Sequence, residues 1–210
     1  EKWFGPIPRR NVTPRNLPKE PRQTAERRLT VSRKVPADAL YMVFHKCNRL
    51  HADYHTFDML SDLLSSGRSS RFIQHLVVKK QIFSSIDAYI SGSIDDGMFH
   101  IAGKPAPGIS LEEAEAAVWH ELEALKTEDI NPIELEKVKN RYESEQIFSN
   151  LNYLNVATNL AFFELLGGAE DINHEVEKYR SVNAEQIKRV AREAFVHENC
   201  SVLYYQAIKS

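Results

Sequence analysis

Alternating polar and apolar residues predict strands near both ends of the chain. Residues 27–34 alternate around Leu29 and Val31, and a short apolar run follows at residues 40–45. A period of two is typical of a strand with one buried face, and a short apolar run is typical of a central strand. We expect these two strands to pair as a meander, and residues 200–208 to form a closing strand.

The middle of the chain contains a predicted hairpin. Residues 82–93 are rich in Ile, Phe, Tyr and Ser, and residues 98–102 form the returning strand. Asp95, Asp96 and Gly97 stand between them and are typical turn residues. The pattern therefore indicates a second antiparallel pair.

Helical spacing accounts for most of the remaining chain. Phe57, Leu60 and Leu64 predict a first helix that ends near Gly67, and Ser69 or Ser70 can cap a second helix over residues 72–77. Further helices are expected to start after the capping residues Ser110, Asn131 and Asn183, and to cover residues 152–166 and 171–179.

This order of elements predicts an α+β fold with an antiparallel or mixed sheet and helices packed on one face. Hairpins separated by helices, without strict β-α-β alternation, favour that class. We expect residues 1–26 to be a proline-rich basic interdomain segment, here called the strap, and residues 27–210 to be a single α+β domain.

Charge divides the chain in the same way. Residues 1–34 contain ten basic and three acidic residues, whereas the whole chain of 210 residues has a net charge of −2. We expect the cations of the strap to lie on acidic surface. A nucleic-acid-binding arm is disfavoured because its arginines are not interleaved with aromatic residues and the body is acidic.

Membrane and secretion signals are missing from the sequence. No run of about 18 apolar residues occurs, and the start at Glu1 lacks both Met and the pattern of a signal peptide. We expect a soluble protein, cytoplasmic or periplasmic, and a piece of a longer chain. Cys47 and Cys200 are expected to be small buried apolar residues, and one disulfide between them stays open.

Common catalytic motifs do not occur. The chain has neither glycine-rich phosphate loop nor the Gly-x-Ser-x-Gly elbow. Residues 67–71 (GRSSR) are interpreted as a turn and helix cap, with an anion nest as the alternative. The charged residues 134–145 are interpreted as a solvated, salt-bridged helix face.

His51 and His55 are the candidate metal ligands. Their spacing of four places them on one face of a predicted helix, where they could share a zinc ion. Hydrolysis also needs a general base, and Tyr54, with its pKa near 10, is a poor one. We expect two solvated surface histidines, and keep an independent zinc-binding domain as an alternative.

Several segments in order resemble the C-terminal, non-catalytic domain of the pitrilysin, insulysin and mitochondrial processing peptidase (M16) zinc proteases. The start KWFGPIP is similar to the linker of that family, and residues 58–72 (DMLSDLLSSGRSSRF) to its helix–Gly–Ser-Ser-Arg-Leu–helix segment. Residues 96–99 (DGMF) and 132–135 (PIEL) follow in the expected order. The resemblance covers nearly the whole chain.

The resemblance implies the fold of the LuxS and processing-peptidase metallohydrolases. It implies that this domain forms scaffold and wall of a peptide-binding chamber in a zinc metalloendopeptidase. Zinc and its His-x-x-Glu-His motif would belong to an upstream catalytic domain, so no catalytic, cofactor or metal residue is assigned here. The expected partners are that domain, a second M16-type half and a peptide substrate.

The partner half of such proteases carries an Arg and a Tyr that bind substrate. The stretch similar to theirs is LVVKKQIFS, so Val77 stands in place of the Arg and Ser84 in place of the Tyr. The resemblance therefore favours the second domain of the zinc-bearing half. The alternative is a domain of a catalytically inactive partner or assembly subunit, of the processing-peptidase or core-protein type.

Overall fold

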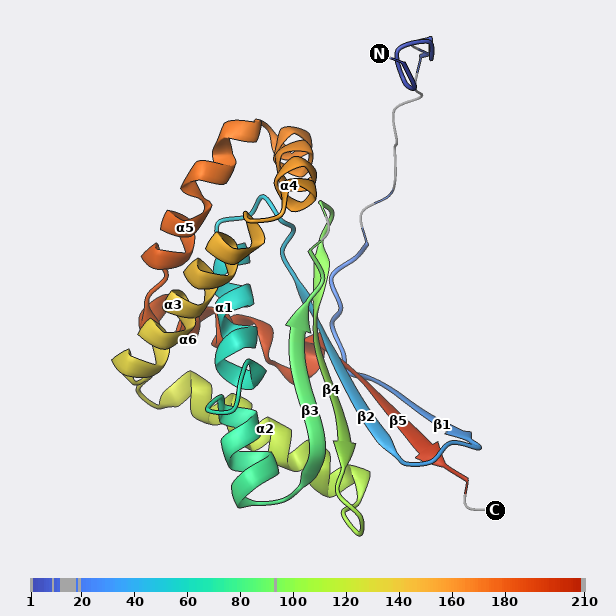
Figure 1. The fold of residues 1–210 in the computed structure, drawn as a ribbon. Coiled ribbons are helices and arrows are strands. Elements are labelled where there is room, and N and C mark those ends of the chain that lie inside the picture. The colour runs from blue at the N-terminus through green and yellow to red at the C-terminus, as the bar shows by residue number, and fades with distance from the viewer. Residues whose placement is uncertain (1, 9, 12–17, 19, 93, 209–210) are drawn as a thin grey trace.

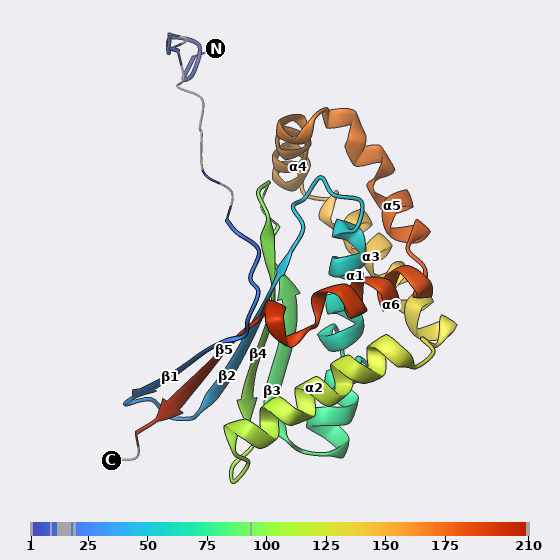
Figure 2. The ribbon, with the colours of Figure 1, turned by 180° about the vertical axis from the view of Figure 1, so that it is seen from behind.

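One five-stranded sheet covered by helices on a single face makes up the fold (Figures 1 and 2). The computed structural model describes residues 2–8, 10–11, 18, 20–92 and 94–208. The strands are β1 (Arg27–Arg33), β2 (Ala39–Lys46), β3 (Phe83–Ile90), β4 (Gly97–Pro105) and β5 (Cys200–Ala207). The predicted α+β class is confirmed.

The helices follow the predicted segments closely. They are α1 (Tyr54–Ser65), α2 (Leu111–Thr127), α3 (Pro132–Ser149), α4 (Tyr153–Leu166), α5 (Glu175–Ser181) and α6 (Ala184–Ala194). A π-helix covers Ile73–Lys79, and 3₁₀ turns cover Ala169–His174 and His197–Asn199. Each α-helix overlaps a predicted segment, but the helix expected over residues 171–179 begins as a 3₁₀ turn and becomes α-helical only at Glu175.

The strand order is β1-β5-β2-β4-β3, so the predicted meander of β1 and β2 is wrong. β5 lies between them, parallel to β1 and antiparallel to β2. Cys200 and Val202 of β5 are buried, whereas β1 is almost fully exposed and suits an edge. The link between β1 and β2 spans residues 34–38, and five extended residues reach about 16 Å, enough to pass over one strand.

The core lies between the sheet and the helices. Leu40, Met42 and Phe44 of β2 alternate with exposed or half-buried residues and point toward the helices. The Phe195 ring, which follows α6, packs edge-on against Phe44 and Phe99, with both pairs of ring centroids 5.0 Å apart. The predicted inward positions of α2 and α6 are buried: Ala114, Val118, Leu122, Leu125, Ile187, Val190, Ala191 and Ala194.

Side-chain caps start four of the predicted helices, including α4, where Asn152 accepts from the backbone N–H of Leu154. Ser110 accepts from the backbone N–H of Glu113, Asn131 from that of Ile133, and Asn183 forms a reciprocal capping box with Gln186. The expected serine cap on the second helix is wrong. The Ser70 hydroxyl donates to the carbonyl of Gly67 instead, and the helix winds as a π-helix without a side-chain cap.

The described end of the strap is already part of the domain. Gln23 is buried, donates to the carbonyl of Cys200 over 2.8 Å and accepts from the Ser201 hydroxyl. Gln23 therefore binds β5 from a position in the chain that precedes β1. Among the described residues, the strap cations Lys2, Arg10 and Arg22 are exposed and form no ion pair. Arg9, Arg15 and Lys19 lie outside the described residues, so the expectation that the strap covers acidic surface stays a prediction for them.

The two cysteines are not joined in a disulfide. Cys200 is buried in β5 and Cys47 is half-buried after β2. Among the residues that the structure describes, no helix combines the length and apolar character needed to cross a bilayer.

Gly103 of β4 provides a test of the packing between β3 and β4. A Cβ atom there would lie 2.5 Å from Cε1 of Phe83. We expect Gly103→Ala to lower the free energy of unfolding by about 1–3 kcal/mol, because the buried ring must move. Urea unfolding measures this. Ala102→Ser, which adds one atom on the opposite face of the same strand, is the control and should change stability by less than about 0.5 kcal/mol.

Candidate functional site

Val77 and Ser84 stand where the resembled family carries its substrate-binding Arg and Tyr. They lie on either side of the link between the π-helix and β3. Val77 belongs to the π-helix and packs half-buried against the core. Ser84 is an exposed extra residue at a bulge of β3, and its hydroxyl donates to the carbonyl of Lys104 over 3.0 Å. Val77 has no polar group to offer a peptide, and the Ser84 hydroxyl is engaged within the sheet.

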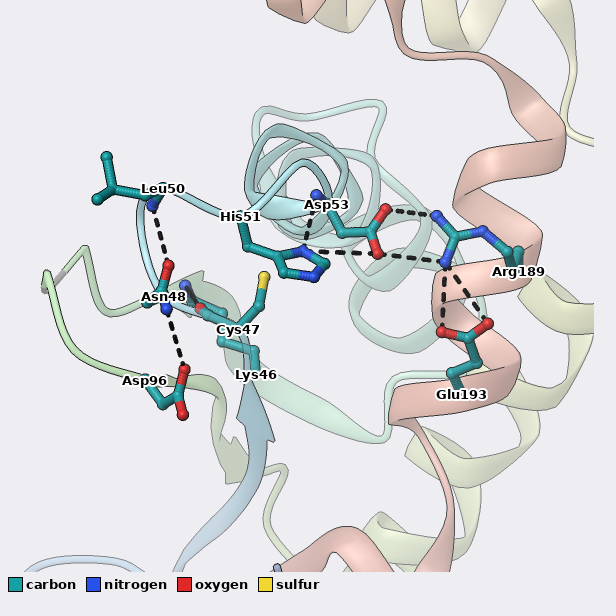
Figure 3. Close-up of polar contacts among 9 residues, drawn as sticks. All are labelled: Lys46, Cys47, Asn48, Leu50, His51, Asp53, Asp96, Arg189 and Glu193. Carbon is teal, nitrogen blue, oxygen red and sulfur yellow. Dashed lines mark hydrogen bonds and ion pairs between the residues drawn. The ribbon is translucent and has the colours of Figure 1, made fainter. Parts of the chain in front are cut away.

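His51 lies in the turn between β2 and α1, not within the helix (Figure 3). Its Nδ1 accepts a hydrogen bond from the backbone N–H of Asp53 over 3.1 Å. The prediction that His51 and His55 share one helix face is therefore wrong, because α1 begins only at Tyr54. His51 shapes the turn that leads into the helix.

Asp53 links this turn to α6. Its carboxylate accepts two hydrogen bonds from Arg189, which also pairs with Glu193 over 3.3 Å (Figure 3). Cys47 lies on the other side of the turn, where burial raises the pKa of its thiol. A thiol with a raised pKa is a poor nucleophile at neutral pH, so its surroundings do not activate Cys47.

His55 belongs to a buried ionic cluster that joins α1 to α5. Its Nε2 lies 3.1 Å from Oε1 of Glu175, and the same oxygen accepts from the Arg49 guanidinium. Arg49 also stacks 4.1 Å from the centroid of the Tyr54 ring. His55 is thus largely buried and paired with Glu175, contrary to the expectation of a solvated surface histidine.

The charges of this cluster explain the ionisation of Glu175. Burial alone would raise the pKa of its carboxyl, but the hydrogen bond with His55 and the positive charge of Arg49 outweigh it, and the pKa is lowered. Nearby, burial raises the pKa of Asp58 despite the hydrogen bond that the Tyr179 hydroxyl donates to it. Opposite shifts within one cluster show that only Glu175 has enough positive partners.

A cavity of about 450 Å³ opens beside the cluster. Arg49, His51, His55 and Glu175 form its polar side, and Phe163 of α4 lies on its apolar side. Among the described residues, no group of three or more His, Cys, Asp or Glu side chains is arranged to hold a metal ion. The arrangement is that of a structural joint between the loop before α1, α4 and α5.

The charged face of α3 and the turn at residues 67–71 are also structural. Arg71 forms a bidentate pair with Glu134, both distances being 2.9 Å, and Arg180 binds Glu136 over 2.7 Å. The salt-bridged interpretation of residues 134–145 is confirmed. Gly67 adopts a positive φ of 86° in the turn, and because Arg71 is paired with Glu134, the turn interpretation replaces the anion nest.

The face of the sheet away from the helices carries exposed aromatic and apolar side chains, and is here called the open face. The register places Val43, His100 and Tyr89 side by side across β2, β4 and β3. The rings of Tyr89 and His100 stack with centroids 4.8 Å apart, and burial lowers the pKa of His100. Tyr41 and Met98 on the same face are also exposed. Figures 1 and 2 show that no helix covers this face.

Comparison with known proteins identifies the family to which this domain belongs. Residues 1–142 match the family described as the peptidase M16 inactive domain. The chain belongs to this family. It is an α+β domain of zinc protease-like proteins.

Relatives of this M16 inactive domain are longer proteins. The zinc protease PqqE of Helicobacter pylori is 26% identical over 145 residues, which are 69% of this chain and 33% of that protein. The uncharacterized zinc protease YmxG of Bacillus subtilis is 25% identical over 200 residues, 94% of this chain and 48% of that protein. The chain therefore spans less than half the length of these relatives.

A solved structure confirms the fold of the M16 inactive domain. The crystal structure of a protease from Helicobacter pylori superposes with a TM-score of 0.90 and 23% sequence identity. The match covers 98% of this chain and 50% of that chain. The open face and the helix-covered face thus belong to a known architecture.

Sequence reasoning missed the ionic cluster of this domain. Arg49 and Glu175 are 126 positions apart, and neither residue lies in a recognisable motif. The only local signal in the sequence was the pair His51 and His55. It indicated a metal ion as the partner of His55, whereas the observed partner is Glu175. The stack of Tyr89 on His100 was also missed, because it needs the register of the hairpin.

Removing the charge of Glu175 tests the cluster. We expect Glu175→Gln to lower the free energy of unfolding by about 3–5 kcal/mol at pH 7, because Arg49 keeps its buried charge without a partner. Glu177→Gln changes an exposed glutamate of the same helix and should have an effect below about 0.5 kcal/mol.

The pH dependence of this difference gives a second readout. Since the folded pKa of Glu175 is lowered, its contribution is present above the ordinary glutamate pKa of about 4.3 and is lost as pH falls through the folded pKa. Wild type and Glu175→Gln should therefore converge in stability under acidic conditions. Urea unfolding from pH 7 to pH 3 measures this, and a constant difference would contradict the assignment.

Proposed function

We propose that this chain is the non-catalytic second domain of a zinc metalloendopeptidase half, and that its open face forms part of the wall of a peptide-binding chamber. The observation that carries the proposal is the open face itself. Tyr41, Tyr89 and Met98 are exposed there, on a sheet whose other face is fully used by the core. Exposed aromatic and apolar side chains in such an arrangement are suited to contact an extended peptide.

The proposed location of the zinc site in another domain follows from the side chains of the described residues. Arg49, His55 and Glu175 satisfy one another inside the fold, and His51 holds its own turn. A hydrolytic zinc site needs several open ligands and a base. Zinc is therefore proposed to bind in an upstream domain, as the names of the related zinc proteases support.

The proposed partners are the upstream catalytic domain and a second M16-type half, in the same chain or in a separate subunit. Val77 and Ser84 support the placement in the zinc-bearing half, because neither gives a peptide the two donors that the partner half would supply. The competing role, a subunit of an inactive assembly, predicts the same open face without peptide cleavage.

The test uses the full-length protein with its partner half. We expect one zinc ion per catalytic chain and cleavage of peptide substrates, measured by metal analysis and by mass spectrometry of the products. A full-length protein without zinc and without cleavage would overturn the catalytic proposal in favour of the inactive subunit.

Tyr89→Ala tests the open face within the active protein. We expect about a tenfold loss of kcat/KM for peptides, carried mainly by KM, because the loss of aromatic contact weakens binding by roughly 1.4 kcal/mol. Zinc content should stay unchanged. Ile133→Ala, on the exposed start of α3, is the matched control and should leave cleavage at the wild-type level. Equal kinetics of the two variants would contradict a role of the open face in peptide binding.

A further inference from the structure

Helix α4 is apolar yet largely exposed. No residue from 146 through 163 carries a charged side chain. Only Phe163 of the helix is buried, whereas Tyr153 is 89% exposed, Leu165 75% and Leu154 73%. The α4 surface is defined here by the exposed apolar residues of this helix, the turn before it and the last turn of α3: Ile147, Phe148, Leu151, Tyr153, Leu154, Leu160 and Leu165.

Such a helix differs from the others of this fold. A helix that is apolar on all sides is normally buried, because a solvent-facing helix keeps charged residues on its outer face. Helix α3 shows that pattern, with exposed Glu and Lys residues along most of its length. Contiguous apolar surface on a folded protein usually marks a contact with another molecule or domain. The α4 surface therefore lacks a partner.

The position of α4 indicates where that partner comes from. Phe163 and Leu166 line the 450 Å³ cavity together with the loop before α1. That loop contacts the β3–β4 turn through Asn48 and Asp96, and residues 20–23 of the strap line a groove with the same loop and turn. Helix α4 and the incoming strap thus lie at one end of the sheet.

The described residues near the start of the chain also carry exposed apolar side chains. Trp3 is 77% exposed, and Phe4 and Ile7 are exposed too. Two apolar features, the α4 surface and the start of the strap, are therefore exposed in this chain.

We propose that the α4 surface is the docking surface for the companion domain that precedes this one in the polypeptide. The inference rests on the proposed function for the existence of that domain, and adds which surface holds it. The length of the relatives supports it, since this chain accounts for 48% of YmxG and 50% of the superposed Helicobacter pylori protease. A covalent connection through the strap raises the effective concentration of the companion to the millimolar range, so a modest apolar contact is enough to fix it.

Other occupants fit the α4 surface less well. A helix that lies on a membrane surface needs a basic face, and α4 has no Lys or Arg. Pairing with a second copy through α4 would bury the α4 surface. It would not explain why the aromatic residues Trp3 and Phe4 are exposed. One preceding domain accounts for both features.

Hydrogen exchange of the full-length protein, compared with the 210-residue chain alone, tests the docking. We expect amides of residues 147–165 to exchange at least about tenfold more slowly in the full-length protein, because docking excludes local opening of the helix. Leu154→Asp in the full-length protein should return them to the fast rate. Ile133→Asp replaces a residue of similar exposure at the start of α3, and should keep the protection.

Several results would overturn the docking proposal. One is equal exchange of α4 in both proteins, and another is a reading frame without a preceding domain. A third is a chain that dimerises by sedimentation and becomes monomeric with Leu154→Asp, and a fourth is binding of the full-length protein to liposomes through α4.

The same preparation separates this proposal from the proposed function. A full-length protein that binds zinc and cleaves peptides but leaves α4 unprotected rejects the docking alone. If α4 is protected in a full-length protein that neither binds zinc nor cleaves peptides, the docking is supported. The catalytic role of the full-length protein is then rejected.

Discussion

The insertion of β5 between β1 and β2 is the constraint on which the rest of the structure depends. It places the last strand of the domain second from the edge of the sheet, where β5 pairs with both β1 and β2 and Gln23 donates to the carbonyl of Cys200 at its start. The helices pack on one face of this sheet, so the opposite face stays open.

The elements themselves could be predicted because their signals are local. Asn183 and Gln186 form the expected capping box, and the turn before Gly97 separates the two strands of the expected hairpin. The pairing of β1 could not be predicted, because its parallel partner lies 174 positions away and leaves no mark on its alternation. The local sequence pattern thus determines which helices and strands form, whereas burial across the whole chain determines which strands pair.

The candidate site shows the same limit more sharply. His51 and His55 have the spacing of metal ligands, but that spacing has meaning only inside a helix, and the helix starts at Tyr54. The true partner of His55 is Glu175, a buried carboxylate that no local pattern distinguishes from its exposed neighbour Glu177. A buried ion pair of this kind fixes geometry between α1 and α5 more than it adds stability, since its desolvation offsets much of the attraction.

The distribution of apolar surface connects the fold to its proposed role. The face of the sheet toward the helices is closed by the core, while the open face and the α4 surface remain uncovered in different directions. We assign the first to a peptide and the second to a companion domain. This assignment agrees with a domain of zinc protease-like proteins.

Photo-crosslinking of a bound peptide to the full-length protein tests the central claim most directly. A substrate-length peptide carrying a benzophenone group should form crosslinks to the open face, at Tyr41, Tyr89 and Met98, and an excess of unlabelled peptide should abolish them. Crosslinks confined to other domains, with the open face unlabelled at saturating peptide, would contradict the claim that this domain forms a wall of the peptide chamber.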